Sequence, residues 1–418
     1  MPNKINYNFF VSIIAPLLIS GPFFPDLIVS LSSLLFLIYI FKNKLFFYFN
    51  KKPYIIFFIF CIYCIFVSIF FAKDLSLSFE SSLFYFRIGI FACFIFYLIE
   101  QDKKILNYFY YALIFSFSIL TIDAYIQFLL GYNIAGLPVY GPRISSFFGD
   151  ELILGSYLAR LFPFLFALFL IRKKNNIEKY YFFFLYGLVF LIIYLSGERT
   201  AFFFMCLSQI FILVLIKRYQ KLIILISIII LIFASVITLN NKKVKDRMIE
   251  QVVDVIVKKD NEEGEKFFIF SRAHDSLIRT AFNMFKEKPI FGHGPKMFRV
   301  LCAEPKYRTG IEPCLTHPHN FYAQLLAETG IIGFMFLLSA FMYVIYCALR
   351  QLKTLFFKEK KYLSDYQVCL LACLLITVWP LSPNGNFFNN WIAIVYSLPV
   401  GFYLHSIYGK NRKKILKE

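Results

Sequence analysis

The segment 316–334, THPHNFYAQLLAETGIIGF, holds the residues best suited to acid–base chemistry, because two histidines precede an apolar, helix-forming run. A neutral imidazole can accept a proton near neutral pH, since the ordinary pKa of histidine is about 6.5. His319 is therefore the candidate general base, while His317 is expected to shape the start of the helix and Asn320 to cap it. Glu328 lies two and a half helical turns beyond His319, on another face, and is expected to hold a helix end or an arginine.

Four arginines could bind an anion: Arg143, Arg199, Arg272 and Arg279. A guanidinium group stays charged and presents a fork of N–H donors that matches phosphate oxygens. Arg272 and Arg279 are two helical turns apart and so share a face. Each arginine also has an ordinary explanation, because a span-end arginine reaches the headgroups and an amphipathic helix exposes its charges to solvent.

The cysteines divide into two groups. Seven of the nine fall within apolar segments and are expected to be small core residues. Cys302 and Cys314 lie in a long polar connection, where an oxidising compartment would allow a disulfide. No histidine and cysteine spacing is that of a metal site, so the sequence predicts neither a metal nor a cofactor.

The elements that position these residues are apolar helices. The chain has 418 residues, of which 59% are hydrophobic and 17% charged, whereas soluble domains average about 25% charged residues. Apolar segments long enough to span a bilayer must satisfy their own backbone hydrogen bonds as helices. The fold class is therefore an all-α, polytopic membrane bundle of about twelve spans: 7–24, 26–41, 54–72, 82–99, 105–130, 149–171, 180–195, 200–216, 222–239, 322–349, 364–380 and 387–406.

The distribution of charge predicts how the bundle is oriented. The net charge of +19 comes from short Lys and Arg clusters between apolar segments, which is typical of cytoplasmic loops and not of a nucleic-acid-binding surface. The alternate short connections carry only Lys73, Arg143 and Arg199. Both termini are therefore expected in the cytoplasm, with the first apolar run retained as a span. Arg87 and Arg160 fall inside spans and are expected to pair with Glu80 or Asp123.

Three regions follow from this topology. Residues 1–239 form the first nine spans, 240–320 an outer connection, and 321–418 the last three spans with a cytoplasmic tail. An outer connection of this length is usually functional. Its hydrophobic periodicity predicts two amphipathic helices, at 244–257 and from Ser271 to before Pro289, with a solvated turn at 258–266 between them.

Four stretches carry a family resemblance when taken in order. HPHNFYAQLLAETGIIGF resembles the His-Asn…Leu…Glu-x-Gly-x-x-Gly signature of the O-antigen ligase and O-antigen polymerase superfamily. SGERTAFF resembles its Ser-Gly-x-Arg-Thr/Ser segment, and SRAHDSLIRTAFNMFKEKPIFGHGPKMF its arginine-bearing helix followed by a Pro-x-x-Gly-x-Gly turn. RISSFFGDELILGSYLA resembles its Arg-x-Ser-Gly-x-Phe…Gly-x-Tyr-Leu region. The resemblance covers roughly residues 140–335.

The resemblance implies a glycosyltransferase of lipopolysaccharide biosynthesis in the bacterial inner membrane. Such an enzyme moves a glycan from undecaprenyl diphosphate to an acceptor at the periplasmic face, without a metal. For a ligase the acceptor is a sugar hydroxyl of the lipid A core, and for a polymerase it is a second lipid-linked chain. By motif, Arg199 and Arg272 would bind the donor diphosphate, with Arg279 as a further candidate, and His319 would be the base. Supporting candidates are Arg143, His317, Asn320 and Glu328.

Ligase is the preferred prediction, because the single long connection 240–320 fits it and the 131–149 connection is short. Polymerase is the alternative, and a lipid-linked-sugar flippase or transporter is a second one that would place ionisable groups along a midplane path. Two residues depart from the family pattern. Glu198 replaces a small residue and is expected to pair with Arg199, and Ser146 replaces a glycine.

Overall fold

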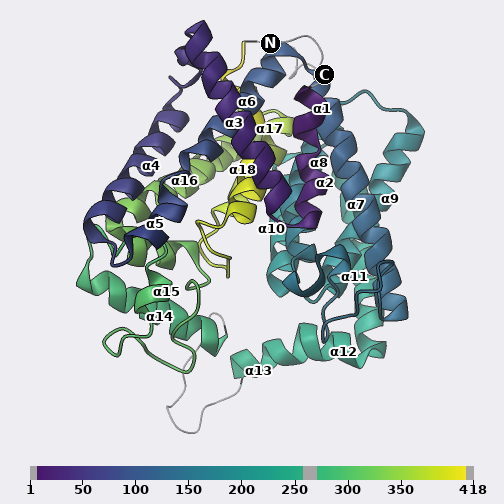
Figure 1. The fold of residues 1–418 in the computed structure, drawn as a ribbon. Coiled ribbons are helices and arrows are strands. Elements are labelled where there is room, and N and C mark those ends of the chain that lie inside the picture. Colours follow the sequence, from purple (N-terminus) through teal and green to yellow (C-terminus); the bar gives the residue numbers. More distant parts are fainter. Residues whose placement is uncertain (1–6, 258–270, 411–418) are drawn as a thin grey trace.

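The computed structural model describes residues 7–257 and 271–410, and these are almost entirely helical (Figure 1). Aromatic and aliphatic runs, with few glycines or prolines inside them, favour helix throughout. The principal helices are α1 (Tyr7–Ser12), α2 (Ile14–Leu17), α3 (Phe23–Asn43), α4 (Lys52–Phe71), α5 (Leu75–Ser82), α6 (Phe86–Gln101), α7 (Lys104–Leu130), α8 (Leu154–Ile171), α9 (Asn176–Leu195), α10 (Arg199–Leu215), α11 (Gln220–Asn240), α12 (Lys242–Lys245), α13 (Gln251–Val257), α14 (Arg272–Glu287), α15 (Phe298–Leu301), α16 (Phe321–Phe356), α17 (Asp365–Thr377) and α18 (Asn390–Tyr408).

The helices confirm a polytopic membrane bundle. In the described part of the chain, nine helices are long and apolar enough to cross a membrane. Three shorter apolar helices cover Tyr7–Ser20, Arg199–Leu215 and Asp365–Thr377. Each of the twelve apolar segments coincides with one of these twelve helical stretches, while the number that span the bilayer stays a prediction.

Helix α8 lies at the centre of the bundle and packs against α17, α10 and α7. In α8, 89% of the residues in the apolar window are buried, whereas in α11 only 17% are. A helix that is apolar all round must be covered by protein or by lipid. The structure therefore places α8 in the protein interior and leaves most of α11 for lipid.

A second, smaller core joins the connection 240–320 to the bundle. Helix α14 buries Leu277, Ala281 and Met284 against residues of α15 and against the first turns of α16. This amphipathic helix begins after Ser271, whose hydroxyl caps it, and ends at Glu287, as the sequence predicts. The helix predicted at 244–257 is formed by α12, a π-turn at Asp246–Glu250, and α13. The turn predicted at 258–266 lies outside the described residues.

Helix α16 is interrupted at Gly330, which has φ +62° and ψ −166°. The turn 289–294 packs on this interruption: Ile331 donates its N–H to the Pro289 carbonyl at 2.8 Å, and Gly294 donates to the Glu328 carbonyl at 2.7 Å. A Cβ atom on Gly330 would lie 2.2 Å from the Ile290 carbonyl oxygen, so the close approach requires glycine. The first part of α16, which follows the two histidines, is thus fixed to the turn after α14.

Both ends of the described chain lie on the same side of the bundle, opposite α14 and α15 (Figure 1). Asn8 donates to the Asp102 carboxylate at 3.0 Å, and the Lys410 N–H donates to the Glu100 carboxylate at 3.0 Å. Both acidic residues lie at the turn between α6 and α7. The termini and this turn therefore share one face, which fits an even number of spans.

The partners predicted for the two arginines within spans, Arg87 and Arg160, are wrong. Arg87 pairs with Asp26 at 2.6 Å, because α3 packs beside α6, whereas Glu80 pairs with Lys296. Arg160 donates instead to Asn384 Oδ1 at 2.8 Å and to a backbone carbonyl of α17. Asp123 accepts its hydrogen bonds from the connection after α7.

Candidate functional site

His319 lies directly before α16 in a left-handed backbone conformation, with φ +53°. Asn320 caps the helix, since its side-chain oxygen accepts the N–H groups of Tyr322 and Ala323 at 3.0 Å each. Non-glycine residues are uncommon in the left-handed region, although histidine enters it more readily than most. Contacts from elsewhere in the chain help to hold the His319 backbone in this conformation.

Those contacts come from the connection between α17 and α18. The N–H of Asn384 donates to the His319 carbonyl at 2.8 Å. The Asn320 amide donates to the carbonyls of Pro380 and Ser382 at 2.8 and 3.3 Å. One turn further along α16, Gln324 donates to Asn386 Oδ1 at 3.0 Å. The backbone of His319 is thus held by a segment more than sixty residues away.

Asn384 is itself held from the centre of the bundle. The Arg160 guanidinium, on α8, donates to Asn384 Oδ1 at 2.8 Å. Its Cζ lies 4.4 Å from the ring centroid of Phe204 and 4.2 Å from that of Tyr396. A buried arginine between two aromatic rings has little freedom to move. Arg160 therefore fixes the connection that in turn supports His319.

Three imidazole rings form a row at the entrance to α16. The ring centroids of His317 and His319 are 4.1 Å apart, and those of His319 and His274 are 5.2 Å apart. His274 comes from the first turn of α14, which the second core packs against α16. His319 is the middle member of the row.

Different arginines act on His274 and His317, the two other rings of the row. Burial, then the charges of His319 and Arg199, lower the pKa of His274 to about 4. Burial, then His319 and weaker effects that include Arg299, lower the pKa of His317 to about 3. The charge of Arg199 thus acts on His274, and that of Arg299 acts on His317.

His319 shares this environment. Burial lowers its pKa below 6.5, and the Asn384 backbone partly opposes that shift. All three rings are therefore neutral near pH 7, and a neutral ring nitrogen can accept a proton. In the described parts of the chain, no group of three or more His, Cys, Asp or Glu is arranged to hold a metal ion.

Arg199 belongs to a cluster of three arginines around Gly197. A Cβ atom on Gly197 would lie 3.3 Å from Cγ of Arg247 and 3.4 Å from Cγ of Arg143. Nε of Arg247 donates to the Gly197 carbonyl at 3.0 Å. Burial, then the charges of Arg199 and Arg143, lower the pKa of Arg247 to about 10. Three like charges held this close attract an anion.

The guanidinium of Arg199 has no hydrogen bond or ion pair with any described residue, although Arg199 is half-buried. The expectation that Glu198 pairs with Arg199 is wrong. The Glu198 carboxylate turns to the start of α8, where it accepts the N–H groups of Gly155 and Ser156 at 2.6 and 3.1 Å and the Ser156 hydroxyl at 2.8 Å. A carboxylate is favoured at a helix N-terminus, and Arg199 is left available to a ligand.

Arg143 is positioned by the connection that follows α7. It donates to the Leu152 carbonyl at 2.7 Å. Gln127, near the end of α7, accepts the N–H groups of Ser145 and Ser146 at 3.0 and 2.7 Å. Ser146 has φ +52°, which accounts for the glycine of the family pattern, and its hydroxyl donates to Asp123.

The other two arginines lie on α14. Arg272 opens the helix, two residues before His274, and is half-buried. Arg279 is 53% exposed and forms an ion pair with Asp275 at 2.6 Å. Arg272 thus lies in the same helical turn as His274. Arg279 is instead ion-paired with Asp275 of its own helix.

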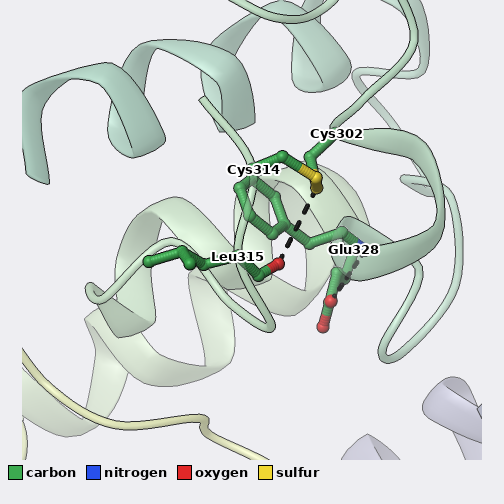
Figure 2. The surroundings of a disulfide bond; sticks show 5 residues. Cys302, Cys314, Leu315 and Glu328 are labelled. Carbon is green, nitrogen blue, oxygen red and sulfur yellow. Dashed lines mark hydrogen bonds between the residues drawn. A yellow bond between two sulfur atoms is a disulfide. The ribbon is translucent and has the colours of Figure 1, made fainter. Parts of the chain in front are cut away.

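Cys302 and Cys314 are joined by a disulfide (Figure 2). Cys302 directly follows α15, and Cys314 precedes His317 by three residues, so the bond anchors the approach to the histidines.

Glu328 is fully buried and accepts the Phe298 N–H, at the start of α15, at 3.1 Å. Its other oxygen accepts from Gln324 at 3.0 Å. Glu328 thus holds a helix end.

Sequence reasoning missed several residues of this site. For the histidine and the two arginines among them, residue type was the one indication in the sequence, because such residues in an outer connection are candidates for chemistry. Asn384 gave no such signal, since its role depends on packing between distant spans. The residues missed are Arg247, His274, Arg299 and Asn384.

Part of the chain matches a known protein family. A family model described as O-antigen ligase matches residues 182–338. The match includes α10 and α14 and the first half of α16, and so it contains Arg199, Arg272 and His319. No curated protein matches the chain. The resemblance is confirmed over residues 182–338, which match the O-antigen ligase family, whose members are glycosyltransferase-like enzymes acting on lipid-linked glycans. The described helices are those of a multi-pass membrane protein.

Proposed function

We propose that this protein is a ligase-type glycosyltransferase of lipopolysaccharide biosynthesis in the bacterial inner membrane. It moves a glycan from undecaprenyl diphosphate to a sugar hydroxyl of the lipid A core, at the periplasmic face. The observation that carries the proposal is Arg199, which is unpaired among the described residues, lies within a cluster of arginines and acts electrostatically on a row of neutral imidazoles. The arginines suit a diphosphate, and His319 suits a hydroxyl group.

The proposed reaction uses these groups in turn. His319 accepts the proton of the acceptor hydroxyl, whose oxygen attacks the anomeric carbon of the donor sugar. The bond from that carbon to the diphosphate oxygen breaks, and its electron pair leaves with the diphosphate. Arg199 and Arg272 stabilise the negative charge of this leaving group, with Arg143 and Arg247 behind them. A single displacement inverts the anomeric configuration.

Ligase is preferred to polymerase because one long connection, 240–320, contributes to the site. The connection 131–153, which carries Arg143, is held compactly against α7. A transporter is disfavoured because the buried arginines are bound to protein groups: Arg87 to Asp26, and Arg160 to Asn384.

Reconstitution of the purified protein with an undecaprenyl diphosphate-linked glycan tests the proposal. One sample receives a lipid A core as acceptor and another receives only more lipid-linked glycan. Transfer to the core is expected. Elongation of the lipid-linked chain without transfer to the core would make the protein a polymerase. Movement of the donor between leaflets without any new glycosidic bond would make it a transporter.

A further inference from the structure

We propose that His274 is a catalytic residue on the donor side, which donates a hydrogen bond from Nε2 to the leaving diphosphate. The inference rests on the proposed function and deepens it, because it assigns opposite tasks to two neighbouring imidazoles. His319 would accept a proton from the acceptor, while His274 would stabilise the leaving group.

The position of His274 is the first step. Its ring lies 5.2 Å from that of His319, with an interplanar angle of 83°, and it shares the first turn of α14 with Arg272. His317 is the other imidazole close to His319, at 4.1 Å. A diphosphate bound by Arg272 would therefore lie beside His274.

The hydrogen bonding of His274 is the second step. The Ser271 hydroxyl oxygen accepts the backbone N–H of His274 at 3.3 Å and lies 2.7 Å from Nδ1. That hydroxyl still has its own hydrogen to donate, and Nδ1 of a neutral ring can accept it. The proton of the ring is then on Nε2. Among the described residues, none is hydrogen-bonded to Nε2, so this donor is open to a ligand.

The charge state of His274 is the third step. The ring is half-buried beside another imidazole and near an arginine, which disfavours the protonated form. A neutral Nε2–H group does not release its proton readily, so it acts as a hydrogen-bond donor. In the reaction, the electron pair of the broken bond from the anomeric carbon stays on the diphosphate oxygen, and no proton needs to be transferred from His274. The acceptor proton ends on His319.

The test compares His274→Phe and His274→Gln with the wild type in the reconstituted transfer assay. Phenylalanine preserves the ring but has no donor, whereas the glutamine amide can place an N–H group near the position of Nε2. We expect kcat to fall roughly 100-fold for His274→Phe, with partial recovery in His274→Gln. Lys286→Ala, on the exposed face of α14, is the matched control and should transfer at the wild-type rate.

A binding measurement accompanies the kinetics. Farnesyl diphosphate, a short prenyl diphosphate, should compete with the donor, and we expect a higher dissociation constant for its direct binding to His274→Phe than to wild type. Ser271→Ala should show a smaller effect in the same direction, because it removes the group that fixes the ring proton on Nε2. Thermal unfolding of each variant checks that α14 remains folded.

The outcomes separate this inference from the proposed function. Wild-type kcat and binding of farnesyl diphosphate in both His274 variants would overturn the role of His274, while transfer that depends on His319 would leave the function standing. If the wild-type protein transfers no glycan, the proposed function fails. Weaker farnesyl diphosphate binding in His274→Phe would then still support the diphosphate contact, and unchanged binding would overturn it.

Discussion

At the scale of single residues, neighbouring groups of the same type have different tasks. The Arg199 guanidinium has no partner among the described residues, whereas Arg279, on α14, is paired with Asp275. His319 has a left-handed backbone held by Asn384, whereas the backbone of His274 lies within a regular helix. Residue type suggests chemistry, but the surroundings of each residue decide which chemistry is possible.

The pH dependence of the reaction is the first prediction. Burial lowers the pKa of His319 below 6.5, so more than half of the rings are neutral at pH 6.5 and nearly all at pH 7.5. The acidic limb of the kcat of glycan transfer should therefore be centred below pH 6.5. An acidic limb centred above pH 7 would show that a different group is the base.

Removal of the base gives a second prediction. His319→Ala should lower kcat by about 10²–10⁴-fold, while the donor still binds. The same variant should retain its competition with farnesyl diphosphate, because the arginines remain in place. Transfer near the wild-type rate would contradict the assignment of His319.

Substitution of Arg199 gives a third prediction. Arg199→Lys keeps the positive charge but loses the planar pair of donors, so it should not restore the donor affinity that Arg199→Ala loses. The KM for the lipid-linked donor, measured in the reconstituted system, is expected to rise in both variants. Arg308→Lys, in the exposed part of the outer connection, is the control and should leave that KM unchanged.

At the scale of elements, the connection between α17 and α18 supports the segment that carries His319, the proposed base. It links Arg160 on the central helix α8 to the His319 backbone through Asn384. No periodicity or motif in the sequence indicates this role, because the connection reads only as a polar turn between two apolar segments. The sequence does predict α14 with its Ser271 cap, since amphipathic spacing and capping are local properties.

Asn384→Ala tests this support. The substitution leaves Arg160 buried without one of its acceptors and loosens the backbone that holds His319, so kcat should fall by up to about 100-fold. The KM for the donor should change little, because the arginine cluster is on other elements. Asn389→Ala, which removes only the cap of α18, is the control from the same connection and should keep its kcat.

At the scale of the whole molecule, the bundle brings segments far apart in sequence to one face, opposite the two chain ends (Figure 1). Hydropathy predicted the apolar helices, because an apolar segment in lipid must form its backbone hydrogen bonds within itself. It could not predict which side chains meet: the expected pairs of Arg87 and Arg160 were wrong, and Arg247 was overlooked. These contacts depend on how α3, α8 and α10 pack.

The orientation of the bundle is open to a direct test. The positive-inside pattern predicts that the termini and the α6–α7 turn are cytoplasmic, and that the disulfide side is periplasmic. Green fluorescent protein fused after Lys410 should therefore fluoresce. Alkaline phosphatase inserted after Pro305 should be active. A dark fusion together with an inactive insertion would reverse the proposed orientation.

The dependence of His319 on Asn384 also has a consequence for biogenesis. The ribosome reaches the codon for Asn384 only after His319 has been synthesised, and at about 5–20 residues per second the interval is roughly 3–13 s. During this interval the proposed donor-binding residues Arg199, on α10, and Arg272, on α14, are already made, yet the backbone of His319 lacks the partner that holds it. A nascent chain would therefore be able to hold donor lipid before it can consume it, and a chain that stops before α18 would remain inactive.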